Sequence, residues 1–222
     1  MSDAASTPHP DPDAWAREVE DQVLSCALPH VAQMGWSPLL VARAGAEAGL
    51  STGEIELLFP NGAADLAALL CRRHDRETGA ILANIDPQTL KIRERIRLAV
   101  ETRLDAAARD EVIARRWCGF LALPYNLGLA SRLLWDSADQ LWRWAGDTAT
   151  DENHYSKRAI LSGILSAALA LRVASGREAA MAFVDARIAN VMSFEKWKAT
   201  TKIRPSEALK TLAQTLGRLR YG

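Results

Sequence analysis

The 222-residue sequence has only three cysteines, Cys26, Cys71 and Cys118, and they are widely spaced. An odd, scattered set favours neither a disulfide framework nor a paired-cysteine metal site, so we expect reduced, mostly buried thiols. The chain has no basic residue before Arg17 and no apolar core before Trp15. This start is typical of neither a secretory signal nor a basic transit peptide. We therefore expect a bacterial cytoplasmic protein, peripheral to the inner membrane if it meets one.

Long apolar runs and catalytic signatures are also missing. No apolar run reaches the ~20 residues of a membrane-spanning helix. No Gly-rich phosphate loop, nucleophile elbow or zinc-protease pattern is present. Cys71 and His74 place a thiol and an imidazole three residues apart, but no second pair of metal ligands accompanies them. The sequence thus predicts no catalytic residues, no metal site and no cofactor, and we expect a protein that is not an enzyme.

Strand patterns and internal repeats are absent as well, whereas helical periodicity is widespread. Ser37 and Ser51 are predicted helix N-caps, and Gly176 is a predicted helix end. The fold class is therefore all-α. The predicted helices cover approximately residues 13–34, 38–48, 52–59, 63–84, 88–109, 111–122, 126–147, 155–175, 177–197 and 206–220.

Basic residues are scarce in the first third of the chain. Residues 1–71 contain Arg17 and Arg43 against ten acidic residues, a net charge of −8 in a chain whose total charge is zero. The first helices, followed by Leu-Phe-Pro at 58–60, resemble the DNA-binding module of TetR-type repressors. The long helices after them resemble the ligand-binding, dimerising half of those proteins.

The charge of this helix-turn-helix-like module opposes DNA binding. Proteins bind DNA by neutralising phosphates with Lys and Arg. The helix that would read the bases, 51–58, has no basic residue and contains Glu54 and Glu56. We therefore expect no nucleic-acid partner. A ligand-responsive TetR-type DNA-binding transcriptional regulator remains the alternative, and an unrelated helical interaction module is a third interpretation.

Residues 117–158 hold four of the seven tryptophans. Three segments, LPYN at 123–126, LWRWAGD at 141–147 and TDENHYSKRAIL at 150–161, resemble the signature of the coenzyme Q (ubiquinone) biosynthesis accessory family known as Coq-nine. Tyr125 stands where that family usually has His, Ala149 where it has Ser, and His154 where it has Trp beside Tyr155.

The resemblance implies a TetR-like fold that has lost DNA binding and forms a homodimer. It implies a membrane-associated, non-catalytic protein that binds an isoprenoid lipid or ubiquinone intermediate and presents it to a quinone-ring hydroxylase. The residues implied for contact with the hydroxylase are Leu141, Trp142, His154 and Tyr155. We also expect Asp151 and Arg158 to pair and to fix the loop that carries His154.

Residues 159–171 alternate small side chains with Leu and Ile. This pattern allows either close helix packing or an apolar cavity that binds an apolar ligand; the resemblance favours the cavity. The expected lipid-binding residues are Trp117, Phe120, Leu121, Leu133, Leu134, Leu161, Ile164, Leu165, Ala168, Val184 and Ile188.

The end of the chain is basic, with seven basic residues and one acidic residue in 196–222. A basic amphipathic helix fits the surface of an anionic membrane, although a terminal helix docked on the core has the same apolar pattern. The expected membrane-binding residues are Leu209, Leu212, Leu216 and Leu219 with Lys210, Arg218 and Arg220.

The chain is thus expected to have four parts. Residues 1–12 form a disordered tail and residues 13–62 the helix-turn-helix-like module. Residues 63–197 form a helical lipid-binding and dimerisation domain, and residues 198–222 a basic linker and an amphipathic membrane helix.

Overall fold

The computed structural model describes residues 12–148 and 152–201, and in these ranges it contains helices and connecting turns but no strand. The all-α prediction is confirmed for this part of the chain. Residues 1–11 of the predicted tail, which was expected to cover 1–12, and the predicted helix at 206–220 lie outside the described residues, whereas Pro12 begins the first helix.

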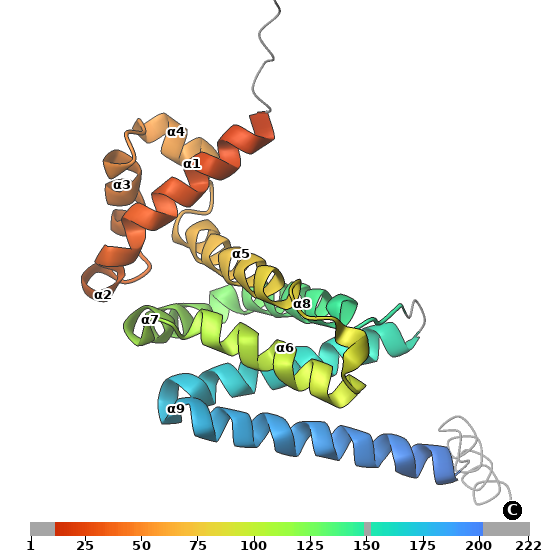
Figure 1. Cartoon of the computed structure of the whole chain (residues 1–222). Helices are drawn as coiled ribbons and strands as arrows, with labels where there is room; N and C mark the ends of the chain where they lie inside the picture. Colours follow the sequence, from red (N-terminus) through yellow and green to blue (C-terminus); the bar gives the residue numbers. More distant parts are fainter. Residues whose placement is uncertain (1–11, 149–151, 202–222) are drawn as a thin grey trace, which may run out of the picture.

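The first helices form a small module at one end of the molecule (Figure 1). The predicted single helix at 13–34 is divided by a 3-10 turn that contains Pro29, because proline cannot donate the backbone hydrogen bond that an α-helix requires. The module consists of α1 (Pro12–Ala27), the 3-10 turn η1 (Leu28–His30), α2 (Val31–Met34), α3 (Pro38–Glu47) and α4 (Thr52–Leu58).

Both predicted N-caps of this module are present. The Ser37 Oγ accepts a hydrogen bond from the backbone N–H of Leu40 at 3.2 Å. Ser51 forms a capping box with Glu54, whose carboxylate accepts from the Ser51 backbone N–H at 2.8 Å. These bonds lower the pKa of Glu54, so the acidic charge on α4 persists well below neutral pH.

The packing of α3 on α4 depends on a glycine. A Cβ atom built at Gly45 would lie 2.3 Å from Cδ1 of Ile55, closer than side chains approach one another. Gly45 therefore lets the two helices meet at the distance that buries the Ile55 side chain against the core of the module.

Five longer helices form the rest of the structure, with α5 leading from the module into a helical bundle (Figure 1). Helix α9 packs against α8 and α6, and α5 packs against α6 and α8. The elements are α5 (Ala63–Leu82), η2 (Pro87–Thr89), α6 (Ile92–Ala107), α7 (Glu111–Leu121), η3 (Pro124–Asn126), α8 (Leu127–Trp144) and α9 (Glu152–Thr201).

The apolar core has two parts. One lies around the N-terminal module and extends through α5 to Trp117 and Leu133. The other joins α6, α8 and both parts of α9, and includes Val100, Leu141 and Val184. Leu169 of α9 packs against both parts and also lines a pocket.

Helix α9 is bent at Gly176, whose φ of 88° and ψ of −179° are not helical. The sequence prediction of two helices separated at Gly176 is therefore confirmed. Glycine suits this position because an L side chain is strained at positive φ. In Figure 1 the second arm of α9 runs back along the bundle. Arg97 of α6 holds it there through a 2.7 Å ion pair with Asp185.

Within the described residues, the stretch His154–Val191 of α9 is long and apolar enough to cross a membrane by length and composition. The sequence prediction did not anticipate this, because alanine, glycine and serine interrupt its apolar runs. Core helices of helical bundles pass the same test. Here the bend at Gly176 divides the stretch, and Leu161, Leu165 and Ala168 are buried against the neighbouring helices.

Candidate functional site

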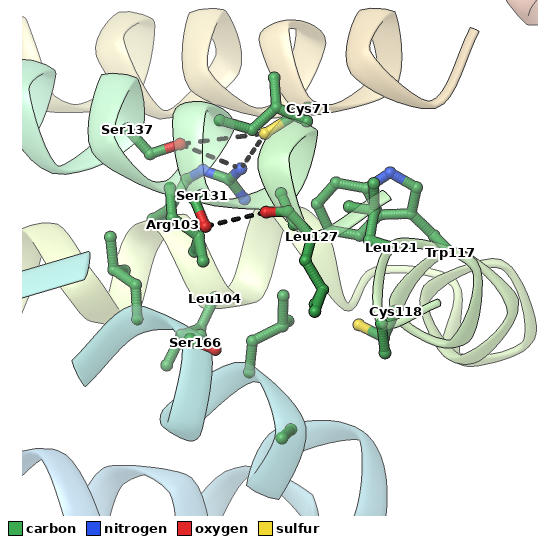
Figure 2. Close-up of a pocket in the computed structure, with 17 residues that line it drawn as sticks. Cys71, Arg103, Leu104, Trp117, Cys118, Leu121, Leu127, Ser131, Ser137 and Ser166 are labelled. Atoms are coloured by element: carbon green, nitrogen blue, oxygen red, sulfur yellow. Dashed lines mark hydrogen bonds between the residues drawn. The ribbon is translucent and has the colours of Figure 1, made fainter. Parts of the chain in front are cut away.

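A pocket of about 320 Å³ lies among α5, α6, α7, α8 and the first arm of α9 (Figure 2). Its volume is at the lower end of the range for small-molecule sites, about 300–1,000 Å³. Most of its wall is apolar. The lining residues are Cys71, Arg103, Leu104, Trp117, Cys118, Leu121, Ala122, Leu127, Ala130, Ser131, Leu133, Leu134, Ser137, Leu165, Ser166, Leu169 and Ala170.

The structure brings together five of the predicted lipid-binding residues in this wall: Trp117, Leu121, Leu133, Leu134 and Leu165. The other six do not line the pocket. Phe120 packs instead near Trp36, with ring centroids 6.4 Å apart. Leu161, Ile164, Ala168, Val184 and Ile188 pack in or against the core formed by α6, α8 and α9. Their apolar faces point to neighbouring helices, which periodicity alone does not distinguish from a cavity.

Trp117 is held rigidly in the wall. Its indole Nε1 donates a hydrogen bond to the backbone carbonyl of Ala67 at 2.9 Å. The His74 ring lies edge-on to it, with centroids 5.6 Å apart. Burial, followed by the nearby charges of Arg103, Arg109 and Arg73, lowers the pKa of His74 to about 3. The imidazole is therefore neutral at physiological pH and packs against Trp117 without lining the pocket itself.

One end of the pocket carries a polar cluster that the sequence analysis missed. The Arg103 guanidinium is buried, and its Nε donates to Oδ1 of Asp75 at 2.6 Å. Ser137 donates to the same carboxylate oxygen at 2.7 Å. Nη2 of Arg103 lies 3.2 Å from the Sγ of Cys71 and donates to it. Figure 2 shows Arg103, Ser137 and Cys71 close together at this end of the pocket.

A sequence signal for Arg103 does exist. Its neighbours on the same face of α6 are Ala99, Val100 and Ala107, all buried, so the periodicity of the helix places Arg103 on the inner face. A buried arginine requires a paired carboxylate. Asp75 is 28 residues away on another helix, and no local spacing identifies it.

The thiols of the pocket are unreactive. Burial raises the pKa of Cys71, and burial raises the pKa of Cys118 to about 11. Both are therefore protonated at neutral pH, and neither is a nucleophile of the thiolate type. Among the residues that the structure describes, no group of three His, Cys, Asp or Glu side chains could hold a metal ion.

A second cluster of charges joins the end of α8 to the start of α9. Arg158 is buried, and its Nε donates to Oδ1 of Asp139 at 2.5 Å while its Nη1 donates to Oδ2 of Asp147 at 2.9 Å. Lys157 pairs with Asp147 at 2.6 Å. Despite burial, these partners lower the pKa of Asp147. The predicted partner of Arg158, Asp151, lies outside the described residues.

Two of the four predicted hydroxylase-contacting residues share an aromatic surface cluster. Tyr155 is 64% exposed, and its ring lies 5.2 Å from that of His154 and 6.2 Å from that of Trp135, centroid to centroid. We call Trp135, His154 and Tyr155 the aromatic patch. Trp135 was missing from the predicted set, although it is one of the four tryptophans in 117–158.

The other two predicted residues lie deeper. Trp142 is half-buried, and its Nε1 donates to the backbone carbonyl of Lys157 at 3.1 Å. The prediction that Leu141 contacts the hydroxylase is wrong, because its side chain is 1% exposed and belongs to the core of the bundle. The side chain of Leu141 lies on the buried face of α8. The predicted membrane-binding residues, 209–220, lie outside the described part of the chain.

The COQ9 family model matches residues 127–195, which include α8, the aromatic patch and most of α9. The bovine (Bos taurus) mitochondrial ubiquinone biosynthesis protein COQ9 is 28% identical over 153 residues, which cover 66% of this chain and 48% of that protein. The human (Homo sapiens) protein gives the same figures. COQ9-A of Xenopus laevis is 27% identical over 161 residues.

The chain therefore spans about half the length of the curated relatives that it matches. The residues matched by the family model contain the segments at 141–147 and 150–161, whereas the LPYN segment at 123–126 lies just before them. Over residues 127–195, which form the end of the helical bundle, the chain is thus similar to the COQ9 family of ubiquinone biosynthesis proteins.

Proposed function

We propose that this protein is a non-catalytic accessory protein of ubiquinone biosynthesis that binds an isoprenoid quinone intermediate in the pocket beside Trp117. The observation that carries the proposal is the pocket itself, about 320 Å³ with a largely apolar wall, in a chain whose residues 127–195 match the COQ9 family model. Burying apolar ligand surface there yields about 25 cal/mol per Å². The pocket is at the small end for a ligand site, so it suits a ring head and the first part of a tail.

The aromatic patch is our candidate contact for a quinone-ring hydroxylase. Exposed tyrosine and tryptophan side chains are enriched at protein interfaces, where they bury large areas with little loss of side-chain entropy. Presentation of the ligand would then require the hydroxylase to bind near the start of α9. Residues 202–222, with their excess of basic side chains, are our candidate for binding an anionic membrane.

The proposal also includes a TetR-like fold without DNA binding, a homodimer and a bacterial cytoplasmic location at the inner membrane. Helices α3 and α4 support the fold, because they pack as a capped helix-turn-helix pair. The charge of α4 opposes DNA binding, because the exposed Glu54 and Glu56 would face the phosphates.

Lipid extraction tests the central claim. The full chain purified from its cells is expected to contain quinones or isoprenoids that mass spectrometry identifies. Ala130→Phe places a ring in the pocket wall and should reduce the bound lipid at least tenfold. Ala174→Phe is the matched control, because Ala174 is exposed and does not line the pocket. A lipid-free protein that shifts a DNA fragment at moderate salt would instead support the repressor alternative.

A further inference from the structure

Arg103 places an ionic group at one end of an otherwise apolar pocket. The side chain is 5% exposed and is fixed on two sides, by Asp75 at 2.6 Å and by Cys71 at 3.2 Å. Gln140 supports the arrangement by donating to the backbone carbonyl of Asp75 at 2.8 Å. The guanidinium therefore has one orientation, which is a requirement for recognising a ligand rather than merely attracting it.

The Arg103 guanidinium uses only some of its N–H groups in hydrogen bonds to the protein. Its Nε and Nη2 bond to Asp75, Cys71 and Ser137, whereas its Nη1 has no hydrogen-bond partner among the described residues. Arg103 lines the pocket, and in Figure 2 the guanidinium lies between Ser137 and Cys71 on one side and Ser131 on the other. The Ser131 hydroxyl already donates to the backbone carbonyl of Leu127 at 2.8 Å. Nη1 is therefore a donor that remains available to an acceptor atom of a ligand in the pocket.

The charge of the cluster determines which acceptor fits. Arg103 contributes one positive charge and Asp75 contributes one negative charge. The two pocket thiols, Cys71 and Cys118, are neutral because burial raises the pKa of each. The cluster is thus already balanced. A ligand carboxylate would bring a second, unmatched negative charge into a buried site, whereas a neutral oxygen would satisfy the donor without that cost.

We propose that Nη1 of Arg103 donates a hydrogen bond to a neutral oxygen of the ligand's ring, a carbonyl, phenol or ether oxygen, and that the pocket therefore selects uncharged heads over carboxylated ones. The inference rests on the proposed lipid-binding function and adds the chemical class of the head group to it. It also gives the ligand a direction, with the ring at the Arg103 end and the tail along the wall formed by Leu133, Leu165 and Leu169.

Three probes with one common short prenyl tail test the selectivity in the full-length protein. The first carries a dimethoxy-benzoquinone head, the second a 4-hydroxybenzoate head, and the third has no head and is a hydrocarbon. Calorimetry or competition against the quinone probe gives the three dissociation constants. We expect the quinone probe to bind at least tenfold more tightly than each of the others, the gain from one charge-assisted hydrogen bond in a buried site.

The variant Arg103→Lys tests the residue. Lysine keeps the charge next to Asp75 but lacks the planar fork that bonds a carboxylate and a second acceptor together. We expect the ratio of quinone to hydrocarbon affinity to fall about tenfold. Arg97→Lys is the matched control, because it makes the same change on the same helix at an exposed ion pair with Asp185. That control should leave the ratio as it is in the parent protein.

The outcomes separate this inference from the function on which it rests. A parent protein that binds the hydrocarbon and quinone probes equally, or prefers the carboxylate probe, overturns the head-group inference and leaves lipid binding standing. A protein that binds none of the three probes overturns both the head-group inference and the proposed lipid binding. The comparison of probes on the parent protein needs no variant, so it holds even where Arg103→Lys does not fold.

Discussion

At the scale of single residues, the fold depends on ionisable groups removed from water. His74 is 8% exposed, its Nδ1 has no hydrogen-bond partner, and its pKa is lowered to about 3 by burial and by the charges of Arg103, Arg109 and Arg73. In the unfolded chain its pKa is near the ordinary value of 6.5. The unfolded chain therefore binds a proton below about pH 6.5 while the folded protein does not.

This difference predicts a loss of stability in acid. Between pH 7 and pH 4.5 the free energy of unfolding should fall by about 2–3 kcal/mol through His74 alone, at about 1.4 kcal/mol per pH unit below 6.5. His74→Phe, which keeps a ring against Trp117, should lack that part of the pH dependence. Urea unfolding of both proteins at the two pH values measures the difference. Parallel losses in both proteins would show that His74 does not cause the acid sensitivity.

The residues that the sequence did not predict share one property. Arg103 pairs with Asp75, 28 residues away, and Arg158 pairs with Asp139, 19 residues away on another helix. The buried face of a helix can be read from its own periodicity, but the partner depends on how helices pack. Trp135 was missed for the same reason, because its contact with Tyr155 joins α8 to α9. Residue types at single positions were thus predictable, whereas their pairs were not.

At the scale of elements, close contact between two short helices shapes the N-terminal module. Gly45→Ala should destabilise the protein by about 1–3 kcal/mol, because its new methyl group would overlap Ile55, which is stiff at its first side-chain torsion. Gly53→Ala is the control, since a Cβ at Gly53 meets no atom within 4 Å. That control should be neutral or stabilising by up to about 1 kcal/mol. Thermal melts of both variants give the comparison, and a stabilised Gly45→Ala protein would contradict the packing.

Element boundaries were predictable wherever a local chemical signal marks them. Ser37, Ser51 and Gly176 each produced the boundary expected of an N-cap or a positive-φ glycine. The 3-10 turn at Leu28–His30 was missed, because Pro29 permits either a bent continuation or a break of the helix. The pocket wall was half predicted for a related reason. Periodicity gives the apolar face of α9 but not whether a helix or a cavity covers that face.

At the scale of the whole molecule, the aromatic patch and the pocket are separate sites, since no residue of the patch lines the pocket. If the patch binds the proposed quinone-ring hydroxylase, Tyr155→Asp should weaken its capture at least tenfold, as expected for an aromatic anchor. It should leave the lipid content unchanged. Tyr125→Asp is the matched control, because Tyr125 is 76% exposed and lies outside the patch.

Surface binding assays with immobilised hydroxylase, followed by lipid extraction from the same preparations, measure both quantities. Equal capture by the Tyr155→Asp and Tyr125→Asp proteins would remove the patch from the proposal. Loss of lipid in the Tyr155→Asp protein would show that the two sites are coupled, contrary to their separation in the structure.

The bend at Gly176 divides α9 into arms of nearly equal length, about 36 and 37 Å at 1.5 Å per residue. Arg97 of α6 holds Asp185 of the second arm, and Leu165 of the first arm lies in the same core cluster as Val100 of α6. Both arms thus pack against α6, and Figure 1 shows the start and finish of α9 at one end of the bundle. The end of the bundle that carries His154 and Tyr155 is therefore also the end at which α9 finishes. A partner bound at the aromatic patch would approach the protein from the side where both arms of α9 terminate.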